Sequence, residues 1–236
     1  MSMTKEMTSG KPYKLILSFA IPLILGNVFQ QLYNMVDTVI VGKFVGVNAL
    51  AGVGSTGAIN FLVIGFALGI CSGFSIMIAQ RFGAGDYSGM RKFIANSIYL
   101  CIAVAVILTA VTMLLTKPIL TVMNTPKEIY DYAYNYIIII FAGISATMFY
   151  NILSGILRAV GDSRTPLIFL GVSSVLNVGL DLLCIIVFKM GVAGAGIATV
   201  ISQAISAFLC LIYIRKNYDI LRFEPVSYTH LTLPTT

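Results

Sequence analysis

Residues 15–41 read LILSFAIPLILGNVFQQLYNMVDTVIV, a run of 27 residues in which Asp37 is the single charged side chain. A transmembrane α-helix needs about 20 predominantly apolar residues, and this run exceeds that length. The rest of the chain has the same character, because 58% of its 236 residues are hydrophobic, 10% are charged and the mean hydropathy is +0.94. A soluble domain carries about 25% charged residues. The sequence therefore predicts an integral membrane protein.

Six apolar segments of this kind follow one another along the chain. They cover residues 15–41, 48–80, 93–116, 132–157, 165–188 and 190–214. The second is long enough for two helices, but a seventh span would invert the charge pattern described next, so we interpret it as one long, tilted span. The sequence thus predicts an all-α bundle of six transmembrane helices. Residues 1–14 form an N-terminal arm, 15–216 the membrane lobe and 217–236 a C-terminal segment.

Lysine and arginine are distributed unevenly between the two sides of this predicted bundle. Eleven lie on the side of the termini, namely Lys5, Lys11, Lys14, Arg81, Arg91, Lys92, Arg158, Arg164, Arg215, Lys216 and Arg222. Four lie on the other side, namely Lys43, Lys117, Lys127 and Lys189. Because cytoplasmic loops carry the excess of basic residues, both termini are predicted to be cytoplasmic in a cell membrane. This bias accounts for the net charge of +6 and requires no nucleic-acid partner.

The cysteines and the C-terminal tail give little information about function. The four cysteines lie inside apolar spans and form no C-x-x-C pair, so neither a disulfide framework nor a metal site is predicted from them. The single histidine, His230, lies in the segment from Ser227 onward, which is polar and aperiodic. Such a segment is typical of a disordered tail or of a non-native extension, and we favour the second interpretation.

Asp37 and Asp181 are the only acidic residues inside the predicted helices, and no basic residue lies within them. A carboxylate in the membrane interior costs at least about 2.5–3.5 kcal/mol, so we expect each to face a cavity and to have a function. The tripeptide PLI at 22–24 precedes Asp37 by 15 residues, and the same tripeptide at 166–168 precedes Asp181 by 15. Both carboxylates are therefore predicted at similar depth, in the outer half of the bilayer. A weak internal repeat of this kind is common in transporters.

Polar side chains share helix faces with both carboxylates. In the first helix these are Asn27, Gln30 and Asn34, and in the fifth they are Ser174 and Asn177. The sixth helix adds Thr199, Ser202 or Gln203, and Ser206, and the fourth adds Tyr132 and Tyr136. Spacings of three and four residues align side chains on one helix face. The stripes predict one wet, net negative pocket suited to an inorganic or an organic cation.

The polar stripes have a second interpretation, in which they join helices by hydrogen bonds. For Asn27, Gln30 and Ser174 both interpretations stay open. For Asp37 and Asp181 we favour function, because no basic partner is available to neutralise them. A carboxylate that takes up a proton or holds Na⁺ can drive exchange, so the coupling ion is the only cofactor expected. Pro22 interrupts the first helix below Asp37 and is a candidate hinge.

Four runs carry a family resemblance. They are Val36-Asp37-Thr38 followed by Gly42, AQRFGAGD at 79–86, RAVGDSRTP at 158–166 and NVGLD at 177–181. In this order, over residues 12–216, they resemble the N-terminal lobe of exporters of the multidrug and toxic compound extrusion (MATE) family. The resemblance implies antiport of cationic, often aromatic compounds against H⁺ or Na⁺, without enzymatic activity.

The same resemblance implies roles for individual residues. Asp37, Asn177 and Asp181 match the cation site, where Na⁺ would bind, and Tyr136 and Thr199 contribute to it, while Pro22 matches the bending position of the first helix. Members of the family have twelve helices in two lobes. This chain stops after six, so we expect a fragment whose C-terminal partner lobe is missing.

Three other classes of protein share part of this pattern. A lipid-intermediate flippase of the same superfamily needs basic residues in its cavity, and none lies inside the predicted helices. An intramembrane aspartyl protease needs Gly-x-Gly-Asp, but Ala159 stands where the first glycine of that motif belongs before Asp162. We therefore reject the interpretation as an intramembrane aspartyl protease. A structural membrane subunit without transport stays as an alternative.

Overall fold

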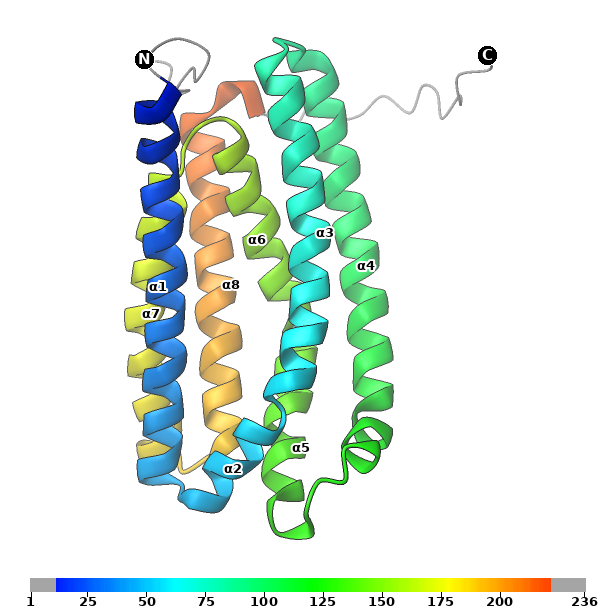
Figure 1. Ribbon diagram of the computed structural model, residues 1–236, viewed down its shortest axis with the longest axis vertical. Helices are drawn as coiled ribbons and strands as arrows, with labels where there is room; N and C mark the ends of the chain where they lie inside the picture. Colours follow the sequence, from blue (N-terminus) through cyan, green and yellow to red (C-terminus); the bar gives the residue numbers. More distant parts are fainter. Residues whose placement is uncertain (1–11, 222–236) are drawn as a thin grey trace.

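The computed structural model describes residues 12–221, which form a bundle of long helices (Figure 1). In chain order these are α1 (Pro12–Phe44), α2 (Val47–Ser55), α3 (Gly57–Gly83), α4 (Tyr87–Val122), α5 (Lys127–Ala142), α6 (Ile144–Ala159), α7 (Arg164–Leu182), the π-helix η1 (Leu183–Val187), α8 (Val192–Asn217) and the 3₁₀ turn η2 (Asp219–Leu221). Within this range five spans are long and apolar enough to cross a membrane, and α5 with α6, bent by 46°, makes a sixth. The predicted all-α bundle of six spans is confirmed. Lys5, Lys11, Arg222, His230 and the tail from Ser227 lie outside the described residues.

The second predicted span is broken, which corrects the prediction of one long helix over 48–80. Helix α2 ends at Ser55 and runs obliquely at one end of the bundle, whereas α3 runs along its length (Figure 1). The Ser55 hydroxyl donates to the Gly52 carbonyl and the Thr56 hydroxyl to the Val53 carbonyl, both at 2.7 Å. Such side-chain hydrogen bonds compete with the backbone ladder and favour a break. Only α3 of the two is long enough to span, so the number of crossings is unchanged.

Two other boundaries also differ from the prediction. Helix α4 continues through Pro118 to Val122 instead of ending at residue 116. Leu120, beyond the proline, is only 1% exposed, and its burial against the core stabilises the extra turn. The fourth span bends at Gly143, where an added Cβ would collide with Val200 of α8. A glycine at this point therefore permits the close approach of the two helices.

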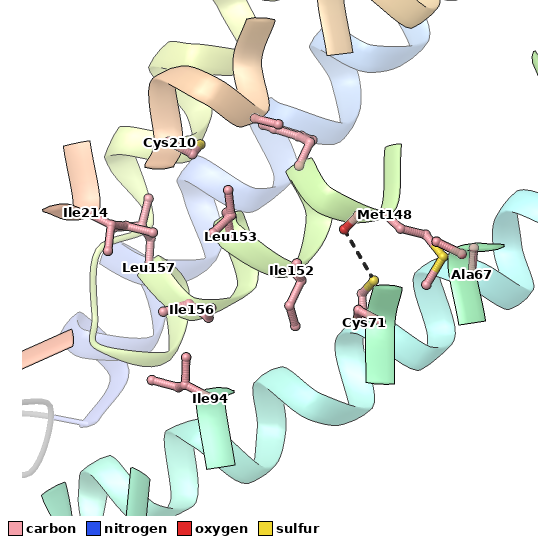
Figure 2. Packing of buried hydrophobic residues seen from close by; sticks show 14 of the residues in the cluster. Ala67, Cys71, Ile94, Met148, Ile152, Leu153, Ile156, Leu157, Cys210 and Ile214 are labelled. Carbon is pink, nitrogen blue, oxygen red and sulfur yellow. Dashed lines mark hydrogen bonds between the residues drawn. The ribbon is translucent and has the colours of Figure 1, made fainter. Parts of the chain in front are cut away.

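Helix α6 lies at the centre of the hydrophobic core. Its side chains Ile152, Leu153, Ile156 and Leu157 are at most 1% exposed and belong to one cluster with residues of α3, α4 and α8 (Figure 2). In contrast, large apolar side chains cover the outer surfaces of α1, α3 and α4, for example Ile16, Phe61 and Leu114. A soluble protein rarely exposes apolar surface on this scale, so lipid or other protein must cover it.

The basic residues form two groups at opposite ends of the bundle. The start of α1, the turn between α3 and α4, the turn between α6 and α7 and the end of α8 lie at one end (Figure 1). This end carries the larger group, as the alternation of loops predicts. One position differs from the prediction, because Arg158 lies in the last turn of α6 instead of in a loop and is half-buried.

The run at 79–86 forms the tight connection between α3 and α4. Gly85 has φ of +73°, a left-handed conformation that favours glycine. The Asp86 carboxylate accepts a hydrogen bond from the Gly89 backbone N–H at 2.8 Å and forms an ion pair with Arg81 at 2.7 Å. The Gly89 N–H and the Arg81 guanidinium hold the pKa of Asp86 below its usual value. The motif therefore has a structural role as the cap of α4.

The contact between α2 and α5 gives a first prediction. A Cβ on Gly52 would lie 2.6 Å from Tyr132 Cβ and 3.0 Å from the backbone nitrogen of Ala133. We expect Gly52→Ala to reduce the free energy of unfolding by about 1–3 kcal/mol, since backbone atoms cannot move aside cheaply. Gly54→Ala is the matched control, because nothing lies within 4 Å of its added Cβ. Thermal unfolding in lipid nanodiscs measures both, and equal stability of the two variants would contradict the packing.

Candidate functional site

Four helices bring the predicted polar residues together inside the bundle. Helix α1 contributes Asp37, α5 contributes Tyr136, α7 contributes Asn177 and Asp181, and α8 contributes Thr199. The site lies next to the smaller hydrophobic cluster of α1, α2, α5, η1 and α8, which includes Tyr136 itself. Helix packing thus places at one location residues that are up to 162 positions apart in the sequence.

Helices α7 and α8 are held together by hydrogen bonds from hydroxyl groups to backbone carbonyls. Ser173 donates to the Ser202 carbonyl at 2.9 Å, and Ser206 donates to the Phe169 carbonyl at 3.2 Å. These bonds cross between the helices and serve as the joining contacts that polar residues make in membranes. Ser174 donates within its own helix, to the Leu170 carbonyl at 2.8 Å. Its hydrogen bond therefore lies within α7 and does not contribute to the contact between α7 and α8.

The two carboxylates are buried close to each other. Asp37 is 6% exposed and Asp181 is 0% exposed. Each carboxyl group interacts electrostatically with the other, and among the described residues neither forms an ion pair with a basic side chain. Two buried carboxylates this close cannot both stay charged without a shared cation. The pair therefore requires a positive charge, either a proton or a metal ion.

Five acceptor oxygens in this region have no hydrogen-bond partner among the described residues. The unpartnered atoms are Asp37 Oδ1, Asn177 Oδ1, both carboxylate oxygens of Asp181 and Gln203 Oε1. Buried polar atoms are normally hydrogen-bonded, so five acceptors without donors in one cluster indicate a site for a cation or for water. All five are oxygens, the ligand type that hard cations prefer. The residues present therefore fit Na⁺ or a shared proton.

Asn177 is fixed in orientation by its neighbour on α8. Its side-chain amide nitrogen donates to the Thr199 hydroxyl at 3.4 Å. Since the nitrogen is occupied by this contact, the amide oxygen is the atom left for a ligand. Asn177 is 1% exposed, so no bulk water competes for that oxygen. Thr199 thus acts on the site through Asn177 and not as part of the carboxylate pair.

Not every predicted residue joins the cluster. Asn34 is exposed, and its amide nitrogen donates to the Gln31 side chain at 3.3 Å. Asn27 is exposed as well, so only part of the predicted stripe on α1 turns inward. Gln30 is half-buried, and its side chain lies near that of Tyr33. The reason is that spacings of three and four residues drift around a helix, and a stripe of 11 residues does not keep to one narrow face.

Tyr33 is a residue of this region that the sequence interpretation missed. It is 9% exposed, its hydroxyl lies near the side chains of Gln30 and Gln203, and it interacts electrostatically with Asp37 and Asp181. The sequence contains a sign of this position, because Tyr33 lies four residues before Asp37 and therefore on the same helix face. It connects the carboxylate pair to Gln203 of α8.

Irregular backbone flanks the site on two helices. The π-helix η1 begins two residues after Asp181. π-Turns are rare and are frequent at functional sites. Pro22 is buried in α1, and the helix continues through it from Pro12 to Phe44. Because Pro22 has no N–H, α1 lacks one internal hydrogen bond there, which makes bending at this position easier.

Fold and site together define a multi-pass helical membrane protein with a buried, unpaired carboxylate cluster. The MatE family model matches residues 22–183, which is more than half of the chain. The chain therefore belongs to the MatE family. The matched range contains Pro22, Asp37, Asn177 and Asp181, while Thr199 lies beyond it.

Relatives and solved structures agree with this assignment. The chain is 33% identical to the probable multidrug resistance protein YpnP of Bacillus subtilis over 90% of this chain and 48% of that protein. It is 33% identical to the probable multidrug resistance protein NorM of Thermotoga maritima, over 87% and 45%. An outward-facing multidrug resistance MATE family transporter of the MOP superfamily is 28% identical, with a TM-score of 0.84 over 94% of this chain and 52% of that one. The chain thus spans about half the length of the relatives that it matches.

Proposed function

We propose that this chain is the N-terminal lobe of a cation-coupled antiporter that exports cationic and aromatic compounds. The observation that carries the proposal is the buried pair Asp37–Asp181. Among the described residues, Asp37 Oδ1 and both carboxylate oxygens of Asp181 have no hydrogen-bond partner, and neither residue has a basic partner. The net charge of this pair changes when a cation binds or leaves, and that change would shift the lobe between its two conformations. Coupling of an ion gradient to transport needs a group with this property.

The coupling ion is H⁺ or Na⁺, held by Asp37 and Asp181 with Asn177 as a neutral ligand. A proton would be shared by the two carboxylates, whereas Na⁺ would take oxygens from all three residues. In both cases the bound ion removes the repulsion between the carboxylates and draws α1 toward α7. Tyr33 and Tyr136 border the pair and exclude bulk water, since each is less than a tenth exposed. Release of the ion would favour bending of α1 at Pro22.

Export requires a second lobe and a path for the substrate. The names of relatives as multidrug resistance proteins support cationic and aromatic substrates, and their double length supports a partner lobe. The polar residues Asn27, Gln31 and Asn34 are exposed on α1, where lipid alone would be a poor neighbour. We propose that this side of α1 faces a water-filled cleft between the two lobes.

The test uses proteoliposomes that contain the complete transporter with this lobe. We expect efflux of a fluorescent organic cation when a proton or a sodium gradient is imposed, and none when both are dissipated. The gradient that drives efflux identifies the ion. The six-helix chain alone should insert into the membrane but show no efflux. Efflux independent of both gradients would contradict the coupled mechanism, and efflux by the six helices alone would contradict the half-transporter proposal.

The orientation in the membrane gives a second prediction. With both termini cytoplasmic, single cysteines at Lys43 and Lys189 should react with an impermeant maleimide added to intact cells. Cysteines at Arg91 and Arg164 should react only after the cells are opened. All variants are made in a background without the four natural cysteines, which are buried and free. Labelling of position 91 from outside would overturn the orientation.

A further inference from the structure

A groove lies between α1 and α7 near the end of the bundle that carries most of the basic residues. It is an open groove with a volume of about 420 Å³, within the usual range of ligand pockets, about 300–1,000 Å³. Its lining residues come from one turn of each helix and are Ser18, Ile21, Pro22, Arg164, Leu167 and Ile168. This groove is separate from the carboxylate cluster, which lies about four turns further along α1.

The groove lies next to a point where α1 packs on α7. Gly26 of α1 packs on α7, where its added Cβ would meet Leu167 and Leu170 at 3.7 Å. One turn closer to the end, Ser18 and Pro22 line the α1 side of the groove. Ile21 and Ile168 on its rim are 52% and 61% exposed. Apolar side chains of a spanning segment at this exposure are suited to contact acyl chains.

Arg164 supplies a positive charge at the mouth of the groove. Among the described residues its guanidinium has no ion pair, since the ion pair found there joins Arg81 and Asp86. The nearby Asp162 carboxylate is occupied by other donors, namely the backbone N–H groups of Arg164 and Thr165 and the hydroxyl of Tyr218. The charge of Arg164 is therefore available to an external anion.

Ser18, on the opposite wall, has a backbone carbonyl that lacks its usual helical donor. Pro22 has no N–H, so the Ser18 carbonyl lacks its helical donor. The Ser18 hydroxyl donates to the Leu15 carbonyl at 3.0 Å and cannot supply that donor. A ligand that carries both a negative charge and a hydroxyl group would satisfy Arg164 and the Ser18 carbonyl together.

We propose that this groove binds an anionic glycerophospholipid whose headgroup carries hydroxyl groups, such as phosphatidylglycerol. Arg164 begins α7, and Leu167 and Ile168 follow within about 6 Å along the helix, so charge and apolar surface are ordered as in a phospholipid. Basic pockets between transmembrane helices bind anionic headgroups in this way. The bound lipid would fill the space beside Pro22 and hold α1 away from α7. The proposal concerns binding alone and does not depend on transport activity.

The test measures lipids that remain bound to the full 236-residue chain. The chain is placed in nanodiscs of equal parts phosphatidylglycerol and phosphatidylcholine, and native mass spectrometry counts the lipids retained after release. We expect the wild type to retain phosphatidylglycerol in preference, and Arg164→Gln to lower that preference about fivefold. Arg215→Gln is the control, because it removes an exposed arginine at the same end, in the last turn of α8.

The variant should fold, because the hydrogen bond from residue 164 to Asp162 uses the backbone N–H and not the side chain. Thermal unfolding of Arg164→Gln checks this point. Soluble glycerol phosphate at millimolar concentration should not displace the lipid, since it lacks the acyl chains. Displacement by glycerol phosphate would assign the site to a free phosphate. Equal retention of phosphatidylglycerol by wild type and Arg164→Gln would overturn the proposal and leave the groove to a protein segment.

Discussion

In the complete transporter, Asp37→Asn is expected to reduce gradient-driven efflux to the level of protein-free vesicles, and Asp181→Asn is expected to do the same. Each substitution keeps the shape of the side chain and removes its negative charge. One carboxylate of the pair then remains, so the repulsion that makes the empty site unfavourable is gone. Binding and release of the ion would no longer switch the lobe between two states, because binding to a single carboxylate relieves no repulsion between like charges.

Expression and membrane insertion should survive these substitutions. A neutral amide costs less in the membrane interior than a carboxylate, so insertion should be equal to or better than that of the wild type. Asn177→Ala should weaken ion binding less than either aspartate variant, because it removes a neutral ligand and leaves both carboxylates in place. Asp131→Asn is the matched control, since Asp131 is an exposed carboxylate in the first turns of α5.

The measurement is efflux of an organic cation from proteoliposomes under an imposed proton or sodium gradient, with protein content matched between variants. A loss confined to Asp37→Asn and Asp181→Asn, with Asp131→Asn unaffected, supports coupling through the pair. Efflux at the wild-type rate in both aspartate variants would refute the mechanism. The two carboxylates would then be polar groups of structural importance only, as the alternative of a membrane subunit without transport predicts.

The sequence predicted the spans and the carboxylate pair because each depends on a strong local cost. A charge in lipid is expensive, so Asp37 and Asp181 are conspicuous among apolar residues without any knowledge of the fold. The prediction of individual site residues was less accurate, because it depends on which side of each helix faces inward. Asn34 shares the spacing of the stripe but lies outside the cluster, whereas Tyr33 lies inside it. Rotation of α1 about its own axis determines which of the two turns inward, and only packing against α7 fixes that rotation.

The breaks within spans depend on individual side-chain contacts, one of them tertiary and the other local. The bend at Gly143 follows from the position of Val200 on α8, and the break at Thr56 follows from hydroxyl groups that bond back to α2. Hydropathy averaged over a whole span does not show the bend at Gly143, and it hides the short stretch of glycine and hydroxyl residues at 54–57. Leu120 shows the opposite case, in which burial carries a helix beyond a proline that would ordinarily end it.

The second large effect is expected at the turn that joins α6 to α7, where Asp162→Ala should destabilise the lobe by about 2–4 kcal/mol. Asp162 Oδ1 accepts hydrogen bonds from the backbone N–H groups of Arg164 at 3.2 Å and Thr165 at 3.0 Å. It therefore caps the start of α7, a contribution of about 1 kcal/mol. Its other oxygen, Oδ2, accepts from the Tyr218 hydroxyl at 3.0 Å.

The lost contact with Tyr218 accounts for the larger part of the destabilisation expected for Asp162→Ala. It is 2% exposed and follows the last residue of α8, so its hydroxyl has little access to water. Burial and the Asp162 carboxylate raise the pKa of Tyr218, which keeps the phenol protonated as a donor at physiological pH. Removing the carboxylate leaves a buried hydroxyl without its acceptor, at a cost of about 1–3 kcal/mol. Asp162→Asn keeps an acceptor oxygen and should cost less than the alanine variant.

A double-mutant cycle of Asp162→Ala and Tyr218→Phe separates the contact from the cap. Thermal unfolding of the chain in nanodiscs is measured for both single variants, the double variant and Asp131→Ala, an exposed carboxylate that serves as the control. The two single effects should exceed the effect of the double variant by about 0.5–3 kcal/mol, since each single change breaks the same bond. Strict additivity would show that Asp162 and Tyr218 do not interact. A non-additive result would mean that the Asp162 carboxylate joins the start of α7 to the end of α8. The far end of α7 carries Asp181.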